Sequence, residues 1–150
     1  MHGARVLRVA RRPNNSKGVA MAFPVPITGL YAGIQAFIAF ALSMRIGPMR
    51  GKLGISIGDG GNKDLLLAVR QHGNWTENVP FALLLMALLE LNGGGTTLLH
   101  GLGAALVVAR IAHPLGLKKD AVNVPLRIAG ALLTGVVTVV AAIALIWKAV

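Results

Sequence analysis

A polar segment interrupts the apolar sequence between Arg70 and Pro80. It reads RQHGNWTENVP and runs directly into the apolar run FALLLMALLEL. Arg70, Asn74 and Glu77 stand at positions i, i+4 and i+7, which gathers them within about 60° of arc on one face of a helix. A guanidinium pairs with a carboxylate through two hydrogen bonds, a carboxylate accepts from an ammonium group, and an amide spans a peptide bond. This face therefore predicts a site for a small zwitterionic ligand.

His72 lies in the same segment but points elsewhere. It stands roughly 200° around the helix from Arg70, where it can face a neighbouring helix or subunit. His72 and Glu77 are five residues apart, and neither an HxxxH nor an ExxH spacing occurs in the chain. Such spacings bring metal ligands onto one helical face, so we expect no metal site. The chain has no cysteine, so any reactive thiol must arrive with a ligand.

The composition is that of an integral membrane protein. Of the 150 residues 55% are apolar and only 13% are charged, too few polar side chains to cover a soluble globule. Four apolar segments, residues 25–44, 65–91, 97–117 and 124–147, each approach the ~20 residues that cross a bilayer as a helix. They lack the alternation of barrel strands. We predict an all-α membrane protein, one bundle of four transmembrane helices.

The predicted connections between these segments are polar. Residues 45–63 form a Gly-rich, charged loop, residues 92–95 a tight NGGG turn, and residues 118–123 a short basic loop. Glu90 and His100, near the NGGG turn, are interpreted as interfacial residues without a further role. A basic stripe with interleaved aromatic residues is absent, so we expect no nucleic-acid partner.

Residues 1–20 are set apart by their charge. They hold five of the fifteen basic residues and no acidic one, and they have no apolar run long enough for a signal peptide. We predict a disordered basic extension followed by one membrane domain over residues 21–150, with Met21 as the natural start. Counted from Met21, the positive-inside rule places the loops at 45–63 and 118–123 in the cytoplasm. The alternative is a basic arm lying on anionic lipid.

The pattern RxxxNxxExxP of Arg70, Asn74, Glu77 and Pro80, on the second of four membrane helices, resembles that of the MAPEG family. These are the membrane-associated proteins in eicosanoid and glutathione metabolism, which include microsomal glutathione transferases. The likeness covers about residues 24–147 and is closest to the small bacterial members. It implies a homotrimer in the bacterial inner membrane that binds glutathione between subunits, near the cytoplasmic side.

The resemblance also implies roles for single residues. It makes Arg70, Asn74 and Glu77 the residues that hold glutathione, with His72 where relatives place a glutamine that reaches the neighbour's ligand. Arg110 and His113 stand where relatives have an arginine and a tyrosine that line the site, and Arg127 where they have the arginine proposed to activate the thiol. A free thiol has a pKa of ~8.5, which a desolvated neighbouring cation lowers.

The leading hypothesis is a glutathione-dependent enzyme that conjugates lipophilic electrophiles or reduces lipid hydroperoxides. Arg127 stabilises the thiolate in either reaction, the electrophile enters from the surrounding lipid, and no second cofactor is needed. Two alternatives stay open, a small proton-coupled exporter and a membrane protein that binds glutathione without turnover. Each of the arginines also has a simpler interpretation, because a long cation near a helix end can extend to the lipid headgroups without any ligand.

Overall fold

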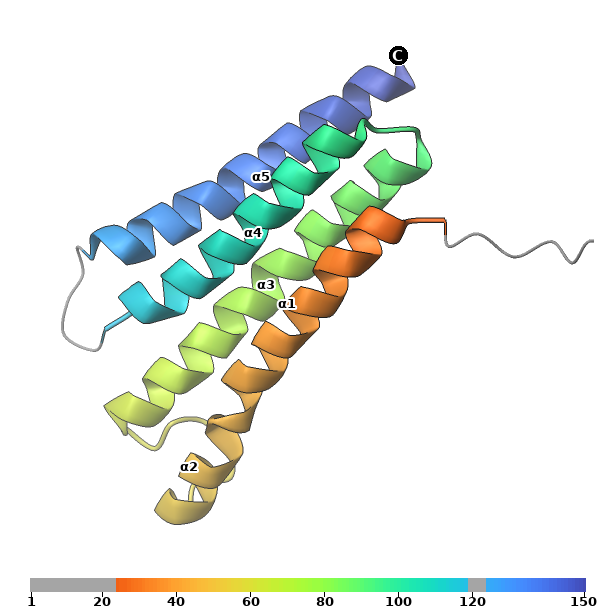
Figure 1. Ribbon diagram of the computed structural model, residues 1–150. Coiled ribbons are helices and arrows are strands. Elements are labelled where there is room, and N and C mark those ends of the chain that lie inside the picture. The colour runs from red at the N-terminus through yellow and green to blue at the C-terminus, as the bar shows by residue number, and fades with distance from the viewer. Residues whose placement is uncertain (1–23, 119–123) are drawn as a thin grey trace, which may run out of the picture.

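The computed structural model describes residues 24–118 and 124–150. Its helices are α1 (Pro26–Met44), α2 (Ile46–Leu53), α3 (Lys63–Leu91), α4 (Thr96–Gly116) and α5 (Pro125–Ala149). The four long helices run alternately up and down in one bundle, and the short α2 lies at one end (Figure 1). The described ranges contain no β-strand. The predicted all-α bundle is therefore confirmed, whereas the predicted extension over residues 1–20 lies outside the described residues.

The two ends of the bundle differ in charge. At one end α1 and α4 finish while α3 and α5 begin (Figure 1). We call it the basic end, because it carries a set of cations: Arg45, Arg50, Lys52, Lys63 and Lys118. The opposite end holds the NGGG turn between α3 and α4 and is called the turn end.

Helix boundaries follow the local signals in the sequence. Pro26 and Pro125 each stand in the first turn of a helix, where the missing N–H group has no intrahelical partner to lose. Asn62 caps α3, its side-chain oxygen accepting from the backbone N–H groups of Asp64 and Leu65 at 3.0 Å each. Gly93 turns the chain after α3 with a φ of +71°, a value that a side chain would strain. These signals explain why the predicted segments and the observed helices nearly coincide.

The expectation of a loop over residues 45–63 was wrong in its first half. That stretch contains α2, a helix of eight residues that includes two glycines and a proline. Its Arg50 guanidinium donates to the carbonyl oxygens of Ser56 at 3.1 Å and Gly58 at 2.9 Å. Tertiary hydrogen bonds to the following loop therefore stabilise a helix that intrinsic propensity does not favour.

Hydropathy distinguishes α3 from the other long helices. Among the described residues, α1 continued through α2, α4 and α5 are each long and apolar enough to cross a membrane. α3 is longer than α4 and α5, with 29 residues or about 43 Å at 1.5 Å per residue, but polar side chains lower its hydropathy. It contacts α1, α4 and α5, so its polar groups can find partners inside the bundle.

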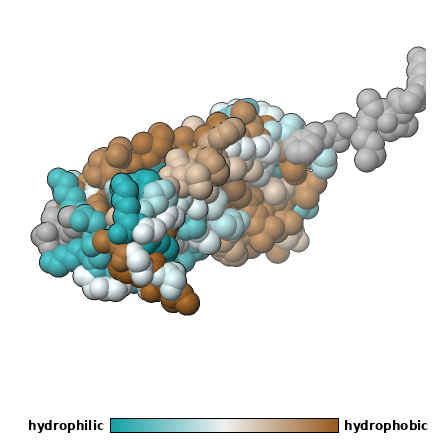
Figure 2. Space-filling view, turned by 90° about the horizontal axis from the view of Figure 1, so that it is seen from below, coloured by the Kyte–Doolittle hydropathy of each residue, from teal (hydrophilic) through white to brown (hydrophobic). Residues whose placement is uncertain are grey.

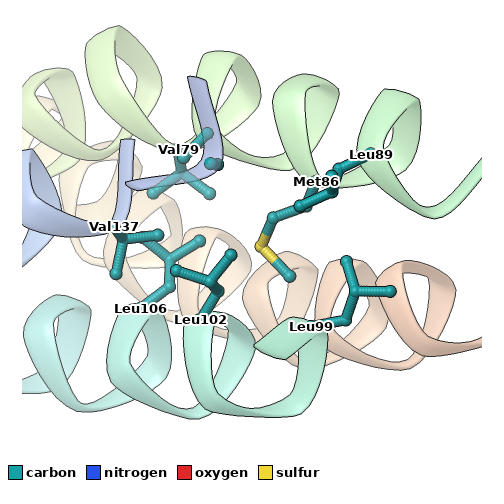
Figure 3. Close-up of a cluster of buried hydrophobic side chains, with 9 residues drawn as sticks. Val79, Met86, Leu89, Leu99, Leu102, Leu106 and Val137 are labelled. Atoms are coloured by element: carbon teal, nitrogen blue, oxygen red, sulfur yellow. The ribbon is translucent and has the colours of Figure 1, made fainter. Parts of the chain in front are cut away.

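The apolar core lies toward the turn end. It is formed by residues of three helices that are all nearly inaccessible (Figure 3): Val79, Ala82, Met86, Leu89, Leu99, Leu102, Leu106, Val137 and Ala141. Because lipid is as apolar as these side chains, their association rests on close van der Waals packing rather than on exclusion of water. Gly103 permits such packing, since a Cβ there would overlap the Tyr31 ring.

Glu90 and His100 have structural roles, which corrects the expectation of none. The Glu90 carboxylate accepts hydrogen bonds from the backbone N–H groups of Ile27 at 2.8 Å and Thr28 at 2.7 Å. These two groups belong to the unpaired first turn of α1, so Glu90 caps that helix from α3. The His100 ring lies 3.1 Å from the hydroxyl of Tyr31. Both residues thus hold α1 in place at the turn end.

The outer surface is suited to lipid. Large apolar side chains are exposed on it, among them Phe37, Phe40, Leu132 and Ile143. In the space-filling view, hydrophilic residues gather toward one end and apolar residues cover most of the remaining body (Figure 2). Such a distribution fits a body set in hydrocarbon with one end in water.

Candidate functional site

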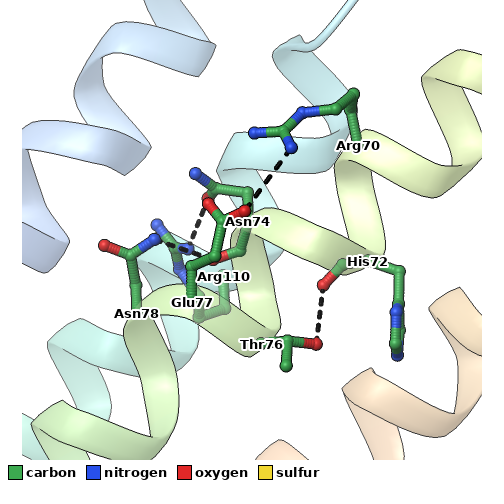
Figure 4. Close-up of polar contacts among 7 residues, drawn as sticks. All are labelled: Arg70, His72, Asn74, Thr76, Glu77, Asn78 and Arg110. Carbon is green, nitrogen blue, oxygen red and sulfur yellow. Dashed lines mark hydrogen bonds and ion pairs between the residues drawn. The ribbon is translucent and has the colours of Figure 1, made fainter.

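Arg70 and Glu77 form an ion pair on α3. Their closest atoms, Nη1 of Arg70 and Oε1 of Glu77, are 3.4 Å apart, and the two side chains are 56% and 55% exposed. Gly73 lies between them, and a Cβ there would stand 3.8 Å from both charged groups, so the glycine leaves the space above the pair open. The structure confirms the predicted common face and adds that both charges are accessible (Figure 4).

Asn74 connects this face to the interior through Arg110 of α4. The Arg110 side chain is only 2% exposed. Its guanidinium donates to Oδ1 of Asn74 at 2.8 Å, to the carbonyl oxygen of Gly130 at 3.1 Å and to the hydroxyl of Thr134. Three helices are therefore joined at one cation. The simpler interpretation, that the cation extends to the lipid headgroups, is wrong for Arg110, because this side chain points into the bundle.

The charge of Arg110 is not balanced by a carboxylate among the described residues. Its partners are an amide, a hydroxyl and a carbonyl, and its Nε atom is buried without a hydrogen-bond partner. A buried cation with neutral partners retains an uncompensated charge. The interior next to Asn74 is therefore electropositive and favours an anionic group.

Sequence reasoning missed a second polar network, centred on Gln71. This buried side chain donates from Nε2 to the carbonyl oxygen of Pro114 at 2.7 Å and accepts from Nη1 of Arg45 at 2.9 Å. The Pro114 carbonyl belongs to the last turn of α4, where intrahelical partners are missing, so Gln71 caps that helix. The signal in the sequence that could have indicated this network is Gln71 itself, a long polar side chain next to Arg70 in a membrane segment.

Thr134 was missed for a different reason. Its hydroxyl accepts from Arg110 and donates to the carbonyl oxygen of Gly130, one turn earlier in α5, at 2.9 Å. A threonine inside an apolar helix commonly bonds to its own backbone, so the sequence alone gives it no role at a site. Only the packing of α5 against α4 reveals that the Thr134 hydroxyl also accepts a hydrogen bond from Arg110.

His72 does not join the Arg70, Asn74 and Glu77 face. Its half-buried side chain lies on another side of α3, as the spacing predicted, and its backbone carbonyl accepts from the hydroxyl of Thr76 at 3.1 Å (Figure 4). Contact with a ligand held by a neighbouring subunit stays a prediction.

His113 and Arg127 lie where α4 packs most tightly on α5. A Cβ added to Gly130 would stand 2.7 Å from the backbone nitrogen of His113, and one added to Gly116 would overlap the backbone of Arg127. His113 is buried there, and Arg127 is half-buried. Arg127 precedes Gly130 by three residues, so it shares the face of α5 that contacts Arg110. The described residues show no hydrogen bond from its guanidinium.

A cavity opens beside Arg70 at the basic end. Its volume is about 250 Å³, and its lining comes from the start of α3 and the end of α4: Lys63, Leu66, Leu67, Arg70, Leu117 and Lys118. The lining thus consists of three cations and three leucines. This lining suits a ligand that carries negative charge next to an apolar part.

The fold and these residues define an integral membrane protein with a polar site on one helix of a four-helix bundle. The model of the MAPEG family matches residues 28–147, and the chain belongs to this family. It is similar to the inner membrane protein YecN of Escherichia coli strain K12, with 34% identity over 90 residues. The protein of that name from E. coli O6:H1 matches equally. The alignments cover 60% of this chain and 69% of each relative. No solved structure matches the chain.

Proposed function

We propose that this protein is a glutathione-dependent membrane enzyme, a transferase or peroxidase that acts on lipophilic electrophiles. The observation that carries the proposal is the open ion pair of Arg70 and Glu77 in a chain with so few charges. A surface ion pair contributes little to stability, at most about 1 kcal/mol, so stability alone gives little reason for two charges on this helix. Glutathione carries two carboxylates and one ammonium group. A guanidinium and a carboxylate held 3.4 Å apart complement these charges.

Asn74 and Arg110 extend the proposed binding surface. The Asn74 amide accepts from Arg110 through its oxygen, which leaves its N–H donors for a peptide carbonyl of the ligand. Behind it, Arg110 supplies a positive charge that no described carboxylate neutralises. A second carboxylate of the tripeptide is attracted toward this region.

Arg127 is proposed to stabilise the glutathione thiolate. It stands at the start of α5, on the face that approaches α4, and no described side chain occupies its guanidinium. A nearby cation raises the thiolate fraction and hence the rate of attack on an electrophile or on a peroxide oxygen. The apolar surface lets the lipophilic substrate enter from the membrane, and holding both reactants together adds a proximity gain. A homotrimer with its sites facing the cytoplasm completes the proposal.

Calorimetry with glutathione tests the binding step. In purified, folded protein, Glu77→Gln and Arg70→Gln are each expected to weaken binding about 10- to 100-fold, the worth of a hydrogen bond to a charged group. Lys52→Gln is the matched control, because it removes a charge at the same end but outside the site, and it leaves binding unchanged. No heat of binding with folded wild-type protein at millimolar glutathione would contradict the proposal.

Conjugation of glutathione to a chlorodinitrobenzene tests the chemical step. Arg127→Gln is expected to lower turnover and to move the pH profile of the rate upward, while glutathione binding is retained. A merely structural role for Arg127 would lower turnover without moving the profile. Glutathione binding with no turnover of any electrophile or peroxide would support the non-catalytic alternative instead.

A further inference from the structure

A buried amide on α1 holds the side of α3 that the proposed glutathione site does not use. Gln35 is fully inaccessible, and its Oε1 accepts a hydrogen bond from Nε1 of Trp75 at 3.0 Å. α1 lies alongside α3, and Gln35 stands at the middle of α1 (Figure 1). Trp75 also packs against the apolar core. The two side chains therefore join the helices inside the bundle, away from both of its ends.

Trp75 and the proposed binding face point in nearly opposite directions on α3. At about 100° per residue, Trp75 lies roughly 140° around the helix from Arg70 and roughly 160° from Glu77. Gln71, one turn before Trp75, shares its side of the helix and bonds to Arg45, which directly follows α1. We call this side the back of α3. It is held by hydrogen bonds, while Arg70 and Glu77 on the other side remain exposed.

Apolar packing alone specifies the rotation of α3 about its axis only weakly. Lipid is as apolar as the leucines of the bundle, so turning an apolar side outward loses little free energy in a membrane. Hydrogen bonds between helices are directional, and hydrocarbon offers them no competing partner. The bond between Asn74 and Arg110 also restrains α3, but it lies beside the proposed ligand, which can disturb it. Gln35 is buried behind the helix, where the ligand does not reach its bond.

The amide of Gln35 lowers stability at this position. Its Nε2 atom is buried without a hydrogen-bond partner among the described residues. An indole N–H can only donate, so it fixes the amide oxygen toward Trp75 and directs the unpaired nitrogen elsewhere. Replacing both members of a buried polar pair by apolar groups is nearly neutral or even stabilising in many cases. A stabilising role alone therefore does not explain Gln35.

We propose that Gln35 is a positioning residue. By holding Trp75 it fixes the rotation of α3, and thus the direction in which Arg70 and Glu77 point. The role of these two charges in binding glutathione rests on the function proposed above, whereas the rotation of the helix does not. Gln35 itself touches no ligand, and its contribution is to keep both charges directed toward one site.

Cysteine labelling measures this rotation without any ligand, because the chain has no native cysteine. Ala68→Cys reports on the back of α3, since Ala68 is 2% exposed and stands two turns before Trp75. Leu66→Cys reports on the opposite side, where Leu66 is 42% exposed. Both positions lie in the first two turns of α3, at the basic end, where a water-soluble maleimide reaches exposed thiols. With Gln35 in place, Ala68→Cys should react much more slowly than Leu66→Cys.

Gln35→Met removes the hydrogen-bond acceptor and keeps the length of the side chain. We expect it to speed labelling of Ala68→Cys about 3- to 15-fold, the worth of one interhelical hydrogen bond in a membrane. Labelling of Leu66→Cys should become slower, because rotation carries that side inward. Leu42→Met is the matched control, since Leu42 is buried seven residues further along the same side of α1 and has only an apolar side chain to change. It should leave both labelling rates unchanged.

Glutathione connects the rotation to the proposed site. A ligand that binds only the correctly rotated helix shifts the population toward it. Saturating glutathione should therefore slow labelling of Ala68→Cys again in the Gln35→Met protein. If glutathione binds but does not slow this labelling, Gln35 does not position the site and the proposal is overturned. If wild-type protein binds no glutathione while Gln35→Met still changes both labelling rates, the proposed function fails and the orienting role of Gln35 stands.

Trp75→Phe breaks the same bond from the other helix, which keeps the test valid if Gln35→Met fails to fold. The double variant should label like either single variant, because all three lack one and the same bond. Unchanged labelling in the folded single variants, even with lower stability, would show a merely structural role. Equally faster labelling of Ala68→Cys and Leu66→Cys would show general loosening of the bundle. Either result would overturn the proposal.

Discussion

The two halves of the bundle are built from the same helices but held together in different ways. Toward the turn end, α3 reads VPFALLLMALLEL and contributes Val79, Met86 and Leu89 to the apolar core. Toward the basic end, the same helix contributes Gln71 and Asn74, whose hydrogen bonds reach Arg45, directly after α1, and α4. The change occurs within α3, near the end of its polar segment.

This difference separates stability from chemistry along one helix. Close packing at the turn end fixes the spacing of the helices, and Glu90 there serves to cap α1. Toward the basic end the network of Arg110 leaves its buried Nε without a hydrogen-bond partner, and the cavities beside Arg70 and Arg45 open there. Unpaired donors and cavities lower the stability of the fold, and the close packing at the turn end can offset this loss. The basic end is consequently the half that is free to bind ligands.

The largest expected effect comes from breaking the turn end. Met86→Ala removes a fully buried side chain from the core and should lower the free energy of unfolding by about 2–5 kcal/mol, because the cavity forfeits packing contacts. Leu88→Ala, on the same helix but 38% exposed, is the control and should cost much less. Denaturant unfolding in detergent measures both. The separation between halves further requires that folded Met86→Ala protein bind ligands at the basic end normally.

A smaller effect is expected at the buried arginine. Thr134→Val keeps the side-chain shape but removes the hydroxyl that pairs with Arg110, and should cost about 1–3 kcal/mol of unfolding free energy. Thr138→Val is the matched control, since the one bond of its hydroxyl among the described residues goes to the carbonyl of Thr134 in its own helix. The same unfolding measurement should show almost no loss there. Equal losses in the two variants would mean that Arg110 does not depend on Thr134.

The helix cap at the turn end ranks third. Glu90→Gln keeps the size of the side chain but removes the charge that two backbone N–H groups of α1 share, and should cost about 0.5–2 kcal/mol. Hydrogen exchange should show faster opening at the start of α1 and unchanged protection in α5. Uniform destabilisation of the whole bundle would contradict a local capping role.

The fold was largely predictable because its signals are local. Apolar runs of bilayer length, prolines in first turns and the NGGG turn fix the four long helices to within about two residues. α2 was missed because its glycines and Pro48 argue against a helix. The hydrogen bonds that stabilise it run from Arg50 to carbonyl oxygens of the following loop. The helix propensities of single residues do not include a contact of this kind.

The site was predictable only where it lies on a single helix. The periodicity of α3 places Arg70, Asn74 and Glu77 on one face, and the ion pair shows that Arg70 and Glu77 do meet there. The bonds from Arg110 to Asn74 and Thr134 depend on the registers of three helices, which no spacing within one segment determines. Interhelical partners therefore had to come from the structure.

The smallest effect on stability, and the sharpest contrast between the two halves, is expected at the exposed pair. Exchanging its charges with Arg70→Glu and Glu77→Arg together preserves an ion pair across the same two turns, so unfolding free energy should change by less than about 1 kcal/mol. Glutathione affinity should nevertheless fall at least tenfold, because each charge of the ligand then meets a charge of its own sign. Unfolding and calorimetry on the same preparation measure the two quantities. Retained binding in the exchanged variant would show that the pair is structural, and the proposed division between a stabilising half and a ligand-binding half would lose its main support.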